Sequence, residues 1–184
     1  REWDNDPTKI SWTRALRADA DRGKRLDIDQ GVFVQSSYRP FFKTWLYFSR
    51  RLNEMVYQIP RIFPSISGAN RVICAVGIGE EQGFSSLMVD SVPEFKTHYN
   101  GQNFPLYLYD QQDEEPGGLF GEQTSGPRRR DAITDIGLKH FQDAYPGETI
   151  NKEDLFYYVY GLLHSEDYRA KYADNLSKEL PRIP

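Results

Sequence analysis

An apolar helix near the end of the sequence most constrains how this chain of 184 residues can fold. From Lys152 to about His164, nearly every position carries an aliphatic or aromatic side chain, and the predicted helix has no polar face. A helix of this kind must be covered by other parts of the structure. The following segment predicts a second helix with one narrow buried stripe. That stripe repeats at a spacing of four and consists of Tyr168, Tyr172, Leu176 and Leu180.

Charged residues cover the rest of this second helix. Asp167 and Lys171 are four residues apart, as are Asp174 and Lys178, and this spacing favours ion pairs along a helix. Pro181 should end the helix, because the residue before a proline avoids helical backbone geometry.

The middle of the chain reads as β-structure. Short runs rich in β-branched and aromatic residues are separated by Gly, Pro and Asn, which is typical of strands joined by turns. The predicted strands are Val32–Gln35, Trp45–Ser49, Arg71–Val76, Phe84–Val89 and Pro105–Tyr109. Strands followed by helices, without regular alternation, predict an α+β fold with short, mostly antiparallel strands and a C-terminal helical lobe.

We interpret residues 1–184 as one domain in four parts. These are a polar lead-in at 1–30, a β-rich body at 31–109, a Gly/Pro-rich loop or linker at 110–130, and a helical lobe at 131–184. A short helix is expected at Ser11–Ala20. The lobe should open with a helix that Thr134 caps and Pro146 with Gly147 ends. The stripe expected on that helix is Ile133, Gly137, His140 with Phe141, and Ala144.

Composition limits the classes of protein to consider. No run of 18 apolar residues occurs, so we expect no membrane span, and no signal peptide is recognisable. The single cysteine, Cys74, excludes an internal disulfide and favours a reducing compartment such as the cytoplasm. The sequence begins at Arg1 without a methionine, so we expect a piece of a longer polypeptide.

Charge is distributed unevenly, although the net charge is only −4. Residues 1–71 hold 13 Lys or Arg against 8 Asp or Glu, a net +5, and the remainder carries −9. One part of the protein could therefore face phosphates while the other repels them. The alternative is ordinary asymmetry between sequence segments, which need not form separate surfaces.

Basic and amide side chains in the β-rich body are candidates for DNA contacts. Arginine and lysine can bind phosphates, arginine can also read guanine, and asparagine or glutamine can read adenine. The candidates on these grounds are Lys43, Arg50, Arg51, Arg61, Asn70, Arg71, Asn100, Gln102 and Asn103. Composition alone favours the simpler alternative, a solvated strand face. Arg128, Arg129 and Arg130 form a second basic run, interpreted as a phosphate contact or, more simply, an exposed linker.

Other motifs are weaker. The glycines in Gly77–Gly83 follow an apolar strand, as in nucleotide or S-adenosylmethionine loops, but a β-hairpin fits better because a strand follows. Asp90, Glu94 and Lys96 partly match a metal-dependent nuclease set, which Pro93 interrupts. The three histidines and Cys74 show no zinc spacing, and no nucleophile with an oriented base is evident.

Several stretches together resemble a known family. They are Tyr38–Phe41, Asn70–Ile73, Phe104–Tyr109, Lys152–Gly161 and Glu179–Pro184. In this order they resemble the C-terminal specificity domain of single-polypeptide Type I (Type ISP) restriction–modification enzymes and of related helicase–methyltransferase polypeptides. The resemblance extends over roughly Trp12 to Pro184.

The resemblance implies a target-recognition domain that follows a nuclease, a helicase-like motor and an adenine-N6 methyltransferase in one prokaryotic polypeptide. Its partners would be duplex DNA and the methyltransferase and motor domains. The chain carries no Walker A loop, no Asn-Pro-Pro-Tyr motif and no usable nuclease set, so we expect it not to be an enzyme itself. We expect no cofactor in this chain, whereas the parent enzyme would use S-adenosylmethionine, ATP and Mg²⁺.

The resemblance also changes which residues are expected to contact DNA. Motifs shared by enzymes that read different sequences should be scaffold, although Arg39 remains a candidate phosphate contact. Base readers are expected in the loops Arg50–Arg61 and Lys96–Asn103, since acidic residues in Gly77–Gly83 and 110–130 disfavour phosphates. Two alternatives remain: a module that couples the methyltransferase to the motor with little base readout, and cofactor binding at Gly77–Gly83.

Overall fold

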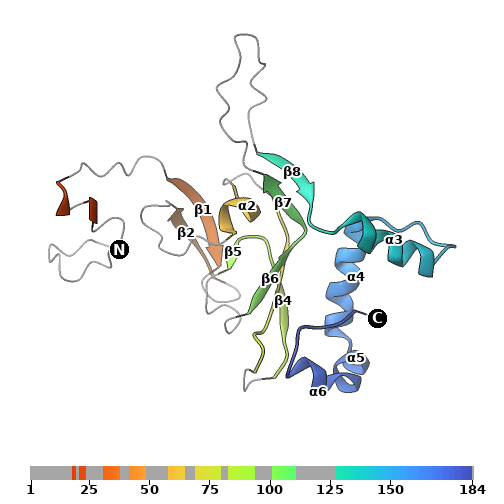
Figure 1. Ribbon diagram of the computed structural model, residues 1–184. Helices are drawn as coiled ribbons and strands as arrows, with labels where there is room; N and C mark the ends of the chain where they lie inside the picture. The colour runs from red at the N-terminus through yellow and green to blue at the C-terminus, as the bar shows by residue number, and fades with distance from the viewer. Residues whose placement is uncertain are drawn as a thin grey trace, which may run out of the picture.

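The computed structural model describes residues 18–19, 21–23, 31–37, 42–48, 58–64, 69–79, 83–93, 101–110 and 127–183. Three small β-sheets come first along the chain and a group of helices follows them, which confirms the α+β prediction (Figure 1). Most of the lead-in, including nearly all of the expected helix at 11–20, lies outside the described residues.

The first sheet has the strand order β2-β1-β5. Strand β1 (Val32–Ser37) pairs antiparallel with β2 (Lys43–Phe48), and β5 (Val92–Pro93) adds in parallel. Side chains alternate between the two faces of a strand, so Val34 and Phe48 point into a hydrophobic core that also contains Phe63 and Val92. The opposite face exposes aromatic rings, and Trp45 is 60% exposed.

The second sheet lies between two hydrophobic cores. Its central strand β3 (Val72–Ala75) pairs antiparallel with β4 (Ser86–Val89) on one side and with β6 (Gln102–Pro105) on the other. All four residues of β3 are buried. Val72 and Cys74 belong to the core shared with the first sheet, whereas Ile73 belongs to the core under the helices. This explains why β3 reads as a continuous apolar run.

A two-stranded ribbon continues from this sheet. Strand β7 (Tyr107–Asp110) pairs antiparallel with β8 (Arg128–Asp131), and the short helix α2 (Ile59–Ile62) lies against β7 (Figure 1). The prediction that residues 110–130 form only a loop or linker is therefore wrong at its C-terminal end. Arg128–Arg130 gain a strand partner that lies about 20 residues earlier in the chain.

Helix α4 (Lys152–His164) has the predicted bounds. Asn151 and Asp154 close a capping box at its start, and Leu155, Phe156 and Leu163 are buried. Lys152 Nζ lies 2.6 Å from an Asp135 oxygen and 3.4 Å from an Asp131 oxygen, so it ties α4 to the end of β8.

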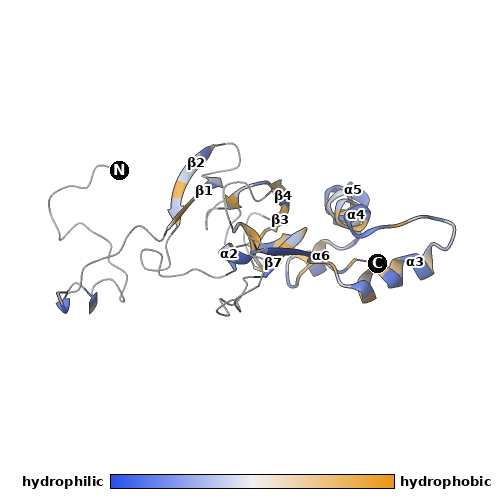
Figure 2. Ribbon diagram, turned by 90° about the horizontal axis from the view of Figure 1, so that it is seen from above, coloured by the Kyte–Doolittle hydropathy of each residue, from blue (hydrophilic) through white to orange (hydrophobic). Residues whose placement is uncertain are grey.

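The sequence predicts that other parts of the structure cover α4 on all sides. This cover is incomplete, because Tyr157 is 43% and Tyr158 42% exposed. Helix α3 (Asp135–Ala144) has the predicted Thr134 cap, but it buries no residue, and Figure 2 shows it set apart from the sheets. Ile136 on α3 is 83% exposed. Both helices therefore leave apolar side chains uncovered within the described part of the chain.

The last predicted helix is broken into α5 (Glu166–Lys171) and α6 (Ala173–Leu176). Tyr168 and Leu176 of the stripe are buried, as expected. Lys178 pairs with Asp174 at 2.8 Å, whereas Lys171 lies over the Tyr172 ring rather than beside Asp167. None of the helices in the described residues is long and apolar enough to cross a membrane.

Candidate nucleic-acid interface

The structure describes six of the eleven residues predicted to bind DNA. These are Lys43, Arg61, Asn70, Arg71, Gln102 and Asn103. The other five, Arg39, Arg50, Arg51, Lys96 and Asn100, lie outside the described residues.

Asn70 is buried and stabilises the fold through its side chain. Its side chain is 2% exposed, and its Nδ2 donates to the carbonyls of Ile62 and Tyr107, both at 2.9 Å. Its Oδ1 accepts from the backbone N–H groups of Arg71 at 2.8 Å and Tyr107 at 3.1 Å. The amide that was predicted to reach an adenine edge is thus fully engaged with backbone, and it joins the end of α2 to the start of β7.

That junction places Arg61 of α2 beside Asp110 at the end of β7. Arg61 Nη2 lies 3.4 Å from Asp110 Oδ1, and Arg61 Nη1 donates to Gln58 Oε1 at 3.2 Å. Arg130 of β8 donates from Nε to both Asp110 oxygens at 3.1 Å. One carboxylate therefore holds two guanidinium groups, and the hydrogen bond from Arg130 is the main reason that the pKa of Asp110 is lowered.

The three arginines of β8 divide between the two faces of the ribbon. Arg128 is the cross-strand partner of Asp110, so it shares a face with Arg130. Arg129 points to the other face, where its Cζ lies 4.3 Å from the centre of the Tyr107 ring. The alternative of an exposed linker is thus replaced by an ordered strand with all three arginines exposed.

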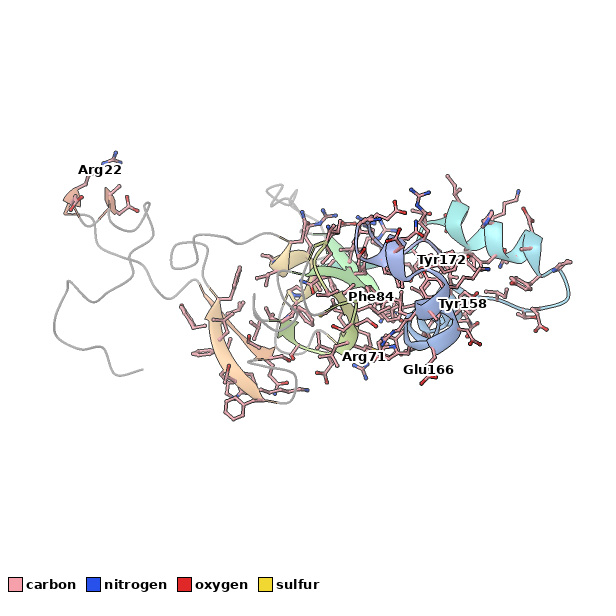
Figure 3. All side chains as sticks on the ribbon, turned by 90° about the horizontal axis from the view of Figure 1, so that it is seen from below. Arg22, Arg71, Phe84, Tyr158, Glu166 and Tyr172 are labelled. Carbon is pink, nitrogen blue, oxygen red and sulfur yellow. The ribbon has the colours of Figure 1, made fainter. Side chains whose placement is uncertain are left out.

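Lys43 and Arg71 gather around a second carboxylate. Lys43 Nζ lies 2.6 Å from Asp90 Oδ1, and this hydrogen bond is the largest cause of the lowered pKa of Asp90. The positive charge of Arg71 lowers the pKa of Asp90 further. Figure 3 shows Arg71 at the edge of the β-rich body. Asp90 is therefore the partner of a lysine, and Glu94 and Lys96 of the nuclease-like motif lie outside the described residues.

Gln102 and Asn103 lie on β6 and are exposed. Asn103 and Arg61 border the same groove of about 1230 Å³, which lies between α2, the second sheet and the C-terminal segment. Its other lining residues are mostly apolar, including Phe104, Val159 and Leu180. The structure thus brings Arg61 and Asn103 to one groove, whereas Lys43 and Arg71 belong to the Asp90 cluster.

The glycine-rich segment joins β3 to β4, an antiparallel pair, so the predicted β-hairpin is confirmed. Gly79 and Gly83 adopt positive φ values of 80° and 76°, which favour glycine in a turn. The residues after Gly83 lead into β4, and no helix N-terminus begins there. No cluster of three or more potential metal ligands occurs among the described residues. Burial raises the pKa of the Cys74 thiol to about 12.

The model of the Type ISP C-terminal specificity domain matches residues 1–184. The chain belongs to this family. Type ISP proteins are also among the solved structures that resemble it, and three such structures contain DNA or a DNA mimic. A search of curated protein sequences finds no match.

The family resemblance inferred from the sequence is thus confirmed. The cryo-EM structure of a DrdV–DNA complex matches at 40% identity and a TM-score of 0.80, over 98% of this chain and 16% of that chain. The Type ISP restriction–modification enzyme LlaBIII bound to DNA matches at 31% identity and a TM-score of 0.75, over 95% of this chain and 11% of that chain. A nuclease-deletion mutant of the Type ISP enzyme LlaGI with a DNA substrate mimic matches at 31% identity and a TM-score of 0.71, over 99% of this chain and 14% of that chain. The specificity domain thus spans less than a fifth of these polypeptides.

Sequence reasoning missed Asp110 and undervalued Arg128 and Arg130. A signal was present, because the aromatic and aliphatic run Tyr107–Tyr109 ends at an acidic residue and a compact basic run follows further along the chain. The intervening polar segment concealed that the two stretches form one hairpin-like ribbon.

Proposed function

We propose that this chain recognises a specific duplex DNA sequence as the specificity part of a Type ISP restriction–modification polypeptide. The observation that carries the proposal is the match to the specificity family over residues 1–184, together with relatives at 31–40% identity whose structures contain DNA or a DNA mimic. Recognition would hold the target so that a neighbouring methyltransferase domain flips and modifies an adenine.

Candidate contacts follow from the placement of the charged and amide groups. Lys43, Arg61 and Arg71 offer phosphate contacts, while exposed Gln102 and Asn103 offer amides for base edges. Asn70 is not among them, because its amide is engaged with backbone. Arg39, Arg50, Arg51, Lys96 and Asn100 remain proposals from sequence alone.

In this proposal the chain recognises DNA and the chemistry belongs to other parts of the polypeptide. S-adenosylmethionine, ATP and Mg²⁺ would serve the methyltransferase, motor and nuclease domains, in the prokaryotic cytoplasm. Motor and nuclease would act at sites that the methyltransferase has not modified.

A domain exchange tests the proposal. Replacing the corresponding segment of a relative such as LlaBIII with residues 1–184 should transfer the methylated sequence, read by sequencing of modified bases in plasmid DNA. The matched control is the relative with its own segment reinserted through the same junctions. A chimera that methylates DNA at the relative's original sequence would refute recognition by this chain.

Exposed aromatic and aliphatic side chains favour a second candidate role, docking on neighbouring domains. Phe42 and Trp45 of the first sheet are each 60% exposed, and Ile136 of α3 is 83% exposed. Such surfaces suit contacts with the methyltransferase or motor domain. If this were the main role, the exchange would leave the recognised sequence unchanged and alter the coupling of ATP hydrolysis to DNA binding.

A further inference from the structure

Two arginines and a carboxylate lie together on one face of the β7–β8 ribbon. Strand alternation and the pairing register place Arg128 and Arg130 on the same face as Asp110. The bonds from Arg130 Nε to both Asp110 oxygens, at 3.1 Å, confirm this arrangement. Arg129, the residue between them, lies on the other face over Tyr107.

Arg61 joins this face from α2, which lies beside β7 (Figure 1). It reaches the same Asp110 carboxylate at 3.4 Å, and Gln58 holds its other terminal nitrogen. The face therefore carries three guanidinium groups and one carboxylate, a net positive charge on a chain whose overall charge is −4. We call Arg61, Arg128 and Arg130 the ribbon arginines.

The ribbon arginines are accessible, and Asp110 holds two of them, Arg61 and Arg130, in position. The side chains of Arg61 and Arg130 are 41% and 46% exposed, and Arg128 makes no hydrogen bond or ion pair within the described part of the chain. An arginine that is already held by a neighbour loses less conformational freedom when it binds a ligand. Asp110 can thus hold Arg61 and Arg130 ready while their remaining N–H groups stay available.

The spacing of Arg128 and Arg130 suits the DNA backbone. Residues two apart on a strand lie about 7 Å from each other, which is comparable with the distance between successive phosphates along one DNA strand. Guanidinium groups bind phosphate oxygens in a bidentate manner, and phosphate contacts set the position of a protein on the duplex.

We propose that the ribbon arginines bind backbone phosphates of the target duplex and that Asp110 is a positioning residue for Arg61 and Arg130. This inference rests on the proposed function, because it assigns that function a phosphate-binding surface in which Arg61, Arg128 and Arg130 share one face with Asp110.

The experiment uses the full-length polypeptide that carries this domain, with a fluorescein-labelled 30-bp duplex of mixed sequence and a second duplex selected by the enzyme from a random library. Anisotropy titrations across a series of NaCl concentrations give the affinity and its salt slope. Arg128→Ala and Arg130→Ala are the test variants. Arg129→Ala is the matched control, since it removes the same charge from the same strand on the opposite face.

For each test variant, the slope of the logarithm of the association constant against log[NaCl] should become less steep by about 0.9. Binding at 0.1 M salt should weaken about eightfold, and equally for both duplexes. Arg129→Ala should keep the wild-type slope. Asp110→Ala should weaken binding although it removes a negative charge, and Asp110→Glu should restore most of the affinity.

Four results would overturn the inference. Equal losses for Arg128, Arg129 and Arg130 would show that only net charge matters. A lost preference for the selected duplex with an unchanged slope would indicate base reading. An unchanged slope with a lower melting temperature would indicate contact with another part of the polypeptide. Tighter binding by Asp110→Ala would refute its positioning role. A wild-type polypeptide that shows no preference between the two duplexes would instead refute the proposed function.

Discussion

Replacing Asn70 with alanine should strongly destabilise the domain. The side chain makes four hydrogen bonds to backbone groups, at 2.8–3.1 Å, from a position that is 2% exposed. Each such bond contributes about 1 kcal/mol net. The partners are only partly buried, so water can replace some bonds, and we expect a loss of about 3 kcal/mol in the free energy of unfolding. For a domain of this size, that corresponds to a fall in Tm of about 6–12 °C.

Urea denaturation of the 184-residue domain, followed by circular dichroism, measures this loss. The matched control is Asn103→Ala, the same change at an exposed position on β6, which should cost less than about 0.5 kcal/mol. The two variants should show equal m-values, so that a change in midpoint reports stability. A cost below about 1 kcal/mol for Asn70→Ala would show that the junction between α2 and β7 does not depend on this amide.

Three further predictions follow from individual sites. Asn151→Ala removes the capping box with Asp154 and should cost about 1 kcal/mol in urea denaturation, and an unchanged midpoint would contradict the cap assignment. Lys43→Met should raise the pKa of Asp90 toward its ordinary value, observed by NMR titration of the carboxyl carbon. Because the folded pKa is lowered, the stabilisation from this pair is present above the ordinary pKa and is lost as pH falls through the lowered value. Lys43→Met should weaken that dependence, since Arg71 still lowers the pKa. Cys74 should resist a thiol reagent at pH 8 in the native protein and react fully in urea, since burial keeps it protonated; rapid native labelling would contradict its placement.

Local patterns were sufficient to predict most of the elements. The helix at Lys152–His164 has the bounds expected from its composition, and Thr134 caps the helix that precedes it. The runs of β-branched and aromatic residues around Val32 and Trp45 form the paired strands β1 and β2. These predictions succeeded because a helix or strand is specified largely by neighbouring residues and their period.

The candidate site was predicted less well. The sequence singled out Arg61 and Asn70 as similar candidates for DNA contacts. In the structure Arg61 is exposed beside a carboxylate, whereas Asn70 is buried and its amide is hydrogen-bonded to backbone groups. Asp110 was interpreted as part of a loop. A residue type indicates which bonds a side chain can make, but only its burial and its neighbours decide which bonds it does make.

The sequence by itself determined the fold class, the family and the helical C-terminal lobe, because these depend on local periodicity and on stretches of recognisable residues. Only the tertiary structure decided that Arg128–Arg130 form a strand beside Tyr107–Asp110, and which of these arginines share a face with Asp110. Strand pairing joins distant segments in a particular register, and a shift of one residue would exchange the two faces of the ribbon. For that physical reason the arginine cluster appears only when the register is known.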